Sequence, residues 1–115
     1  YKRQAEGLSN EDMEALSQHY SALPFVPAQQ AFDSELAAAG AILQEGTCAK
    51  CHADGGKVAG TGPRLAGQWM DYLRTSLKYV PTGEHLVPRT MENAVTGLSR
   101  EDLDKLIHYY ASQQD

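Results

Sequence analysis

The amino-acid sequence predicts an all-α fold, and three observations indicate it. No segment alternates polar and apolar residues over the length of a strand. Apolar residues instead recur three or four positions apart in four stretches, which is the helical period. Runs that contain proline or glycine separate these stretches and are expected to end the helices. At 115 residues the chain is long enough for one ordinary domain.

The first predicted helix covers residues 9–22. Ser9 can cap it, and Asp12 stands at the third helical position, as in a variant of the capping box. The apolar stripe of this helix comprises Leu8, Met13, Leu16 and Tyr20. Two prolines in the run 23–27 then break the helix and predict an extended linker.

A second, alanine-rich helix is expected from Asp33 to Glu45, with Gly46 as its stop. Its apolar stripe comprises Phe32, Leu36, Ala39 or Gly40, and Leu43. A glycine inside a helix costs about 1 kcal/mol relative to alanine. We therefore expect Gly40 to allow another helix to approach closely.

The second half of the chain predicts two further helices around irregular segments. Residues 47–67 are rich in glycine and irregular, and a helix follows over 68–80 with Trp69, Leu73, Leu77 and Val80 on one face. Residues 83–97 are predicted to be mostly loop, with one helical turn after Pro88. The last helix begins after Ser99 as its cap, and its apolar face comprises Leu103, Leu106, Ile107 and Tyr110.

Composition excludes several classes of protein. The net charge of −5 and the pI of about 5.3 argue against a nucleic-acid-binding protein, which would carry a basic surface. No apolar run approaches the roughly 18 residues of a membrane span, and two cysteines do not make a disulfide scaffold. The sequence begins with Tyr1 rather than methionine, which favours a processed form whose signal peptide has been removed.

One sequence pattern occurs twice. The segment 7–12, Gly-Leu-Ser-Asn-Glu-Asp, returns at 97–102 as Gly-Leu-Ser-Arg-Glu-Asp. The match continues with Leu16 against Leu106 and with Tyr20 against Tyr110. Two unrelated helices that share a common capping signal would also explain it. The alternative is that the N-terminal segment is the closing helix of another domain of the same type.

The segment 48–52 reads Cys-Ala-Lys-Cys-His, which is the C-x-x-C-H attachment signature of c-type haem. Two thiols at this spacing can add to the two vinyl groups of one porphyrin, and His52 is then placed as the proximal iron ligand. A thioredoxin-like redox pair would require a preceding strand, and none is predicted. A zinc site would need two more ligands, but His85 and His108 are isolated. The sequence therefore predicts one covalent haem c on Cys48 and Cys51.

The sixth iron ligand decides between electron transfer and catalysis. Met91 is favoured because it lies in a predicted loop, which can bring a thioether across the porphyrin face. Met70 lies in a regular helix and is expected to make core contacts, whereas Met13 precedes the motif. The histidines outside the motif, His19, His85 and His108, are expected to be solvated.

Further residues are expected around the haem. The carbonyl of Pro63 is predicted to accept a hydrogen bond from the free ring nitrogen of His52, and Leu65 belongs to the same irregular run. Arg64 is a candidate for a propionate contact, with simple solvation as the alternative. The predicted haem walls are Trp69, Tyr72 and Leu73, with ordinary core packing as the alternative.

These motifs together resemble a class I cytochrome c of the two-domain cytochrome c4 type over residues 33–113. They are the C-x-x-C-H segment, the run 62–68 (Gly-Pro-Arg-Leu-Ala-Gly-Gln), the late methionine and the capped last helix. A closer resemblance is to the second half of the cytochrome subunit of flavocytochrome c sulfide dehydrogenase. It is carried by the segments 27–33, 51–57, 65–69 with Tyr72 and Leu73, and 110–114.

The resemblance implies an electron-transfer subunit in the bacterial periplasm, not catalytic by itself, in a heterodimer. Its partner would be an FAD-containing subunit that oxidises sulfide, and it would pass electrons singly to a soluble acceptor. Residues 1–32 would then be a remnant of a first haem domain, and residues 33–115 the haem-binding domain, because only one C-x-x-C-H occurs. The alternatives are a free-standing cytochrome shuttle and a haem enzyme or gas sensor with a labile sixth site.

Overall fold

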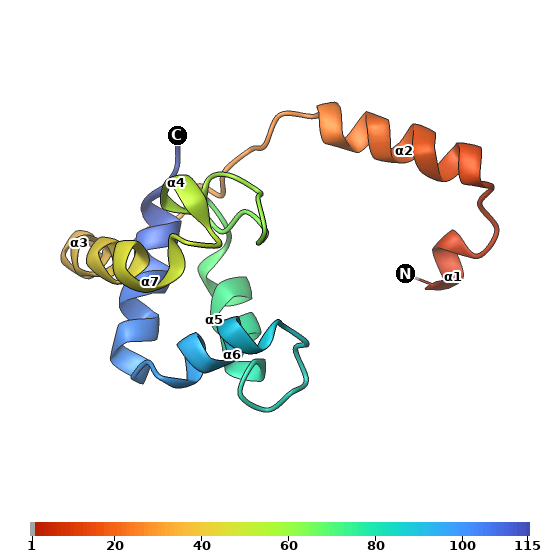
Figure 1. The fold of residues 1–115 in the computed structure, drawn as a ribbon. Coiled ribbons are helices and arrows are strands. Elements are labelled where there is room, and N and C mark those ends of the chain that lie inside the picture. Colours follow the sequence, from red (N-terminus) through yellow and green to blue (C-terminus); the bar gives the residue numbers. More distant parts are fainter. Residues whose placement is uncertain (1) are drawn as a thin grey trace.

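Helices account for all the regular structure of residues 2–115, which are the residues that this computed structural model describes. Tyr1, from which a processed chain is expected, lies outside the described residues. The elements in chain order are α1 (Lys2–Ala5), α2 (Asn10–Ala22), α3 (Ser34–Leu43), the π-helix η1 (Gln44–Cys48), α4 (Ala53–Gly56), α5 (Met70–Tyr79), α6 (Arg89–Thr96) and α7 (Arg100–Ser112). The all-α prediction is confirmed (Figure 1).

The core forms where α7 crosses α3 and packs against α5. Leu73 of α5 meets Leu106, Ile107 and Tyr110 of α7, and each of these four side chains is almost fully buried. Gly40 is the point of closest approach, because a Cβ there would overlap the main-chain carbonyl of Lys105. The close helix contact predicted at Gly40 is therefore confirmed.

The predicted stop of the second helix at Gly46 is wrong. After Leu43 the chain continues as η1, in which the amide of Ala49 donates to the carbonyl of Gln44 at 2.8 Å, five residues earlier. Gly46 has open space around it and behaves as an ordinary helical residue. The π-turn inserts one extra residue per turn and carries the helix directly into Cys48.

Two boundaries in the second half of the chain also differ from prediction. The helix expected from residue 68 begins at Met70, because the side-chain carbonyl of Gln30 accepts from the Met70 amide at 3.0 Å. Residues 89–96 form the two-turn helix α6, where the sequence predicted a loop with a single turn. Pro88 occupies the N-cap position of α6, and Val95 anchors the helix in the core.

Helix α2, which corresponds to the first helix predicted from the sequence, stands apart from the rest of the molecule (Figure 1). Ser9 and Asp12 form the predicted capping box at its start, with the Asp12 amide 3.1 Å from Ser9 Oγ. Every side chain from Arg3 to Val26 is exposed, so α2 buries none of its apolar stripe in this chain. The linker that follows is extended, as predicted, and joins the body where the amide of Ala28 donates to the Gly67 carbonyl at 2.8 Å.

Candidate haem site

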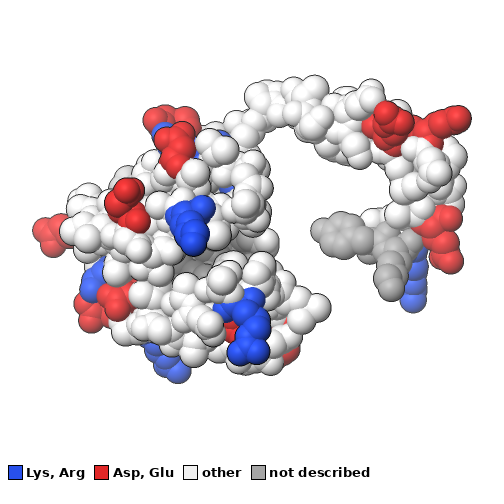
Figure 2. Space-filling view, viewed as in Figure 1, with Lys and Arg blue, Asp and Glu red and all other residues white. Residues whose placement is uncertain are grey.

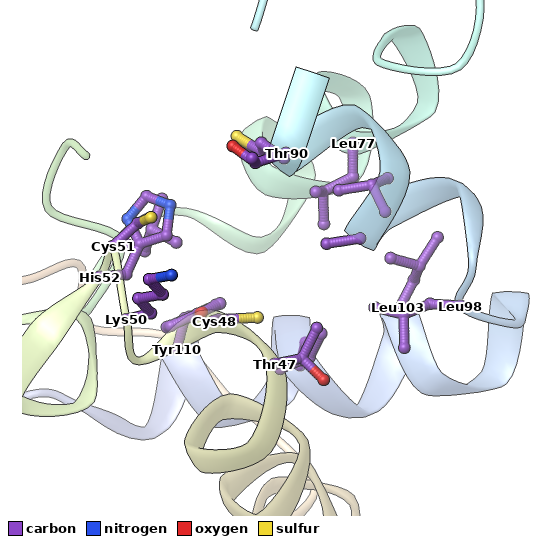
Figure 3. Close-up of a pocket in the computed structure, with 15 residues that line it drawn as sticks. Thr47, Cys48, Lys50, Cys51, His52, Leu77, Thr90, Leu98, Leu103 and Tyr110 are labelled. Atoms are coloured by element: carbon purple, nitrogen blue, oxygen red, sulfur yellow. The ribbon is translucent and has the colours of Figure 1, made fainter. Parts of the chain in front are cut away.

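A cavity of about 240 Å³ lies among η1, α5, α6 and α7. Its walls are mainly aliphatic, and all but a few of its lining side chains lack charge. They are Thr47, Cys48, Lys50, Cys51, His52, Leu65, Leu77, Thr90, Met91, Ala94, Val95, Leu98, Leu103, Leu106 and Tyr110. Figure 3 shows Cys51 and His52 on one side of the cavity, Leu98 and Leu103 on the opposite side, and Thr90 and Leu77 above the space between them.

His52 is buried and held at its ring. Its Nδ1 lies 2.9 Å from the main-chain oxygen of Pro63. A carbonyl oxygen only accepts hydrogen bonds, so Nδ1 carries the proton and Nε2 keeps a free lone pair. Gly62 lies against the same ring, where a Cβ would stand 2.5 Å from His52 Cε1. The ring therefore presents an unprotonated nitrogen that can ligate iron.

The two cysteines line the cavity beside His52. A tight turn presents them, since the amides of Cys51 and His52 both donate to the Cys48 carbonyl, at 3.1 and 2.9 Å. Burial raises the pKa of the Cys48 thiol, whereas a redox-active pair requires a lowered thiol pKa. Among residues 2–115 no cluster of three or more His, Cys, Asp or Glu side chains is placed to hold a metal ion.

Met91 is in the first turn of α6 and lines the same cavity as His52. Met70 instead packs against the buried core cluster, and Met13 is exposed on α2. Of the three methionines, Met91 alone shares the cavity with the C-x-x-C-H residues. The structure thus brings together two thiols, an imidazole and a thioether from segments far apart in the sequence.

The residues predicted around the haem occupy different positions. Leu65 lines the cavity, and Pro63 contacts it only through the His52 hydrogen bond. Arg64 donates to the carbonyls of Ala66 and Lys57, at 3.1 and 3.0 Å, and its guanidinium lies 4.0 Å from the centre of the Phe25 ring. These contacts hold Arg64 to the protein backbone and to the linker.

The three residues predicted to form the walls of the haem pocket are not among the described residues that line this cavity. Trp69 and Tyr72 are 58% and 57% exposed, because Trp69 precedes α5 as its N-cap and Tyr72 lies on the outer face of that helix. Leu73 is buried in the helix core instead. Leu77, one turn later, is the α5 residue that reaches the cavity.

The histidines outside the motif differ in environment. His19 is exposed on α2, in line with the prediction, but His108 is half-buried. Its Nδ1 accepts from the amide of Asp33 at 2.8 Å, next to the N-terminus of α3, so the expectation of a solvated side chain is wrong there. His85 Nδ1 lies 3.3 Å from the Ser76 carbonyl. These contacts are to the protein main chain rather than to the cavity.

Sequence reasoning missed two contributions to the site. The first is the full helix α6, which supplies Thr90, Ala94 and Val95 beside the predicted Met91 and has the helical spacing of apolar residues over only two turns. The second is Gln44, a fully buried polar residue behind the cysteines.

The donor set fits a covalently attached haem c. Two thiols suit attachment to the vinyl groups, and a neutral imidazole with a thioether suits iron in the low-spin state of electron carriers. The aliphatic walls suit the apolar porphyrin face. When bound, such a group supplies one-electron redox chemistry.

Comparison with known proteins gives the family. Residues 35–109 match the model of the cytochrome c oxidase cbb3-type subunit III family. Cytochrome c-554(548) of Halomonas halodenitrificans is 38% identical over 72 residues, which are 60% of this chain and 87% of that protein.

Two solved structures are also similar. Cytochrome c4 of Acidithiobacillus ferrooxidans matches with a TM-score of 0.73 at 25% identity, over 94% of this chain and 67% of that one. Thiosulfate dehydrogenase (TsdBA) of Marichromatium purpuratum matches with a TM-score of 0.70 at 33% identity, over 95% of this chain. This chain spans only 26% of the dehydrogenase chain.

Proposed function

We propose that this chain serves as the electron-accepting subunit of a sulfur-oxidising dehydrogenase. The chain belongs to the class I cytochrome c family and is a haem c electron-transfer protein. The partner is an FAD-containing subunit that oxidises sulfide in the bacterial periplasm. The chain takes electrons from it one at a time and passes them to a soluble acceptor. The observation that carries the electron-transfer role is the convergence of Cys48, Cys51, His52 and Met91 on one aliphatic cavity.

Two observations support a sulfur-oxidising partner. The linker and the segment after His52 resemble the cytochrome subunit of flavocytochrome c sulfide dehydrogenase. Independently, one similar solved structure is a thiosulfate dehydrogenase, although this chain spans about a quarter of it.

Within residues 2–115 every helix is too short or too polar to span a lipid bilayer.

In this proposal Cys48 and Cys51 would hold the porphyrin covalently, and His52 and Met91 would supply the nitrogen and the sulfur that ligate the iron. Pro63 keeps the proton of His52 on Nδ1, which leaves Nε2 for the iron. Leu65 and Leu77 exclude water from the porphyrin face. Arg64 supports the loop of Pro63 through its main-chain contacts.

Ligand substitution tests this assignment. Met91→Ala should lower the reduction potential, since a thioether favours ferrous iron, and should let carbon monoxide bind. Met70→Ala is the matched control, because Met70 packs on the core outside the cavity, and it should change stability without opening the iron. If Met70→Ala opens the iron and Met91→Ala does not, the ligand assignment is wrong. If the unmodified protein binds carbon monoxide readily, an enzyme or gas sensor replaces the carrier.

A second candidate function is that of a free-standing cytochrome shuttle. It is favoured by the match to cytochrome c-554(548), which extends over 87% of that protein. Affinity purification of the chain from its native source discriminates the two. An FAD-containing polypeptide in stoichiometric amount supports the dehydrogenase subunit, whereas a chain that elutes alone at native concentration supports the shuttle.

We also propose that residues 1–32 are the counterpart of the closing helix and linker of a further haem domain. The same cap begins α2 at Ser9 and α7 at Ser99, and the solved cytochrome c4 matches 94% of this chain. Residues 33–115 alone are about 72% of the sequence, so that match extends into the N-terminal segment. In this proposal a second haem domain covers α2. Its counterparts of α3 and α5 would form the same kind of helix face on which α7 packs in this chain, and α2 would pack on that face.

Charge supports an apolar partner surface for this segment. Residues 15–32 contain no Lys, Arg, Asp or Glu, and Figure 2 shows the corresponding uncharged stretch between the body and the acidic end of the arm. Deletion of residues 1–26 should change the stability of the haem-binding domain little, because their described side chains are exposed, although the contact of Phe25 with Arg64 is lost. It should abolish binding to a separate polypeptide that carries the second haem domain. Unchanged binding would contradict the proposal, as would a loss of stability alone.

A further inference from the structure

Gln44 and His52 are buried polar residues, and a hydrogen bond connects them. Gln44 is 2% exposed and lies at the first position of η1. Its Nε2 donates to the main-chain oxygen of His52 at 2.7 Å. Its Oε1 accepts from the hydroxyl of Tyr110, which is 3% exposed on α7. A chain of hydrogen bonds thus runs from the C-terminal helix to the residue that ends the C-x-x-C-H motif.

The direction of each hydrogen bond follows from chemistry. The carbonyl of His52 can only accept, so Gln44 must present its NH₂ group there. The amide oxygen then faces Tyr110, whose hydroxyl must donate. Burial raises the pKa of the Tyr110 hydroxyl, which keeps this donor protonated. The positive end of the Gln44 amide dipole therefore lies next to His52.

We propose that Gln44, anchored by Tyr110, is a positioning residue that fixes the orientation of His52 and raises the reduction potential of the site. His52 is then held at two independent points, its ring by the Pro63 carbonyl and its main chain by Gln44. The inference rests on the proposed ligation of iron by His52. It assigns to a helix residue outside the motif a role in tuning that ligand.

Two physical effects act in the same direction. A buried amide donor that points at the His52 carbonyl places positive partial charge near the ligand, which disfavours the more cationic ferric state. A firmly held histidine also keeps the imidazole in one orientation, as partners behind metal-bound histidines do. Removal of the Gln44 amide should therefore lower the reduction potential and change the orientation of the His52 ring.

The test compares Gln44→Leu and Tyr110→Phe with the parent protein carrying its covalent haem. Gln44→Leu keeps a similar volume but removes both hydrogen bonds, and we expect the equilibrium constant for haem reduction to fall at least threefold. That corresponds to about 28 mV at about 59 mV per tenfold change for one electron. Tyr110→Phe keeps Gln44 but removes its anchor, together with the contact of the Tyr110 hydroxyl with Cys48, and should give a smaller fall in the same direction. The haem-methyl NMR shifts of the oxidised protein report the ring orientation and should move in both variants.

Ile107→Ala is the matched control, because it weakens the same α7 core without touching Gln44 or the cavity. It should lower stability and leave the potential and the methyl shifts unchanged. The proposal is overturned if Gln44→Leu loses stability with both readouts unchanged, or if Ile107→Ala moves them equally. Should Gln44→Leu not fold, unchanged readouts in Tyr110→Phe overturn it. If the haem of the parent protein is not ligated by His52, the proposed function is refuted instead. The spectrum of the parent protein shows this before any variant is compared.

Discussion

Gly40→Ala tests the helix crossing on which the whole site depends. Gly40 faces α7, and the added Cβ would overlap the carbonyl oxygen of Lys105 and stand 2.7 Å from its carbonyl carbon. The Cβ of Tyr109 would lie at 2.8 Å. The overlapping atoms are mainly main-chain atoms, which cannot rotate away, so the two helices must separate. Gln44 and Tyr110 lie further along the same pair of elements and would move apart with them.

Two effects oppose each other in this substitution. Alanine gains about 1 kcal/mol over glycine inside a helix. Overpacking costs typically about 1–3 kcal/mol, and a main-chain overlap belongs at the upper end. The expected net loss is therefore about 2 kcal/mol in the free energy of unfolding. Since about 1 kcal/mol shifts Tm by roughly 4–8 °C in a domain of this size, the Tm should fall by roughly 8–16 °C.

Thermal unfolding of the haem-loaded protein, followed by far-UV circular dichroism and by the Soret band, measures this loss. Gly46→Ala is the control, because nothing lies within 4 Å of its added Cβ and the backbone there is helical. Helix propensity should make that variant more stable, by up to about 1 kcal/mol. Equal stabilisation by both substitutions would show that α3 and α7 are not in the predicted contact.

The remaining predictions concern the caps and the histidine loop. Ser99→Ala should lower the stability of the haem-binding domain by about 1 kcal/mol, whereas Ser9→Ala should lower only the helicity of the exposed α2. The Ser99 hydroxyl and then Lys105 hold the pKa of Asp102 below its ordinary value of 3.8, so its carboxylate stabilises the fold above that pH. The difference in unfolding free energy between the parent and Asp102→Asn should therefore close only below pH 3.8, as Asp102 becomes protonated. Gly62→Ala should displace the His52 ring and reduce the fraction of low-spin haem in the visible spectrum.

Local signals in the sequence determine much of the fold. A serine followed three residues later by an aspartate correctly marked the starts of α2 and α7, because this cap is formed within one helical turn. The prediction at Gly40 also succeeded, because a glycine inside a helix lowers helix stability and is best explained by the close approach of another element. Only one turn of α6 was predicted because its pattern spans just two turns, and Val95 is buried at a cavity whose other walls include Leu77 of α5 and Leu103 of α7.

The candidate site was predictable where its residues are adjacent in sequence. Cys48, Cys51 and His52 form one motif, and the structure places all three at the cavity. Trp69 was expected to line the cavity because its spacing matches Leu73, but it lies before the first turn of α5 and faces outward. Gln44 was missed because it is a polar residue, although it stands four residues after Gly40 on the buried face of the helix.

The repeated capping pattern separates what a sequence encodes locally from what a partner must supply. The helices α2 and α7 share a cap, a length of 13 residues and a tyrosine at matching positions, Tyr20 and Tyr110. Tyr110 is 3% exposed, whereas Tyr20 is 67% exposed. A helix of 13 residues is marginal in water without a surface on which to bury its apolar stripe. The stripe of α2 therefore requires a complementary helix face, and within residues 2–115 the surface that α7 covers is an example of such a face. That correspondence is the physical reason to seek a second haem domain, in the same polypeptide or in a partner, as the occupant of α2.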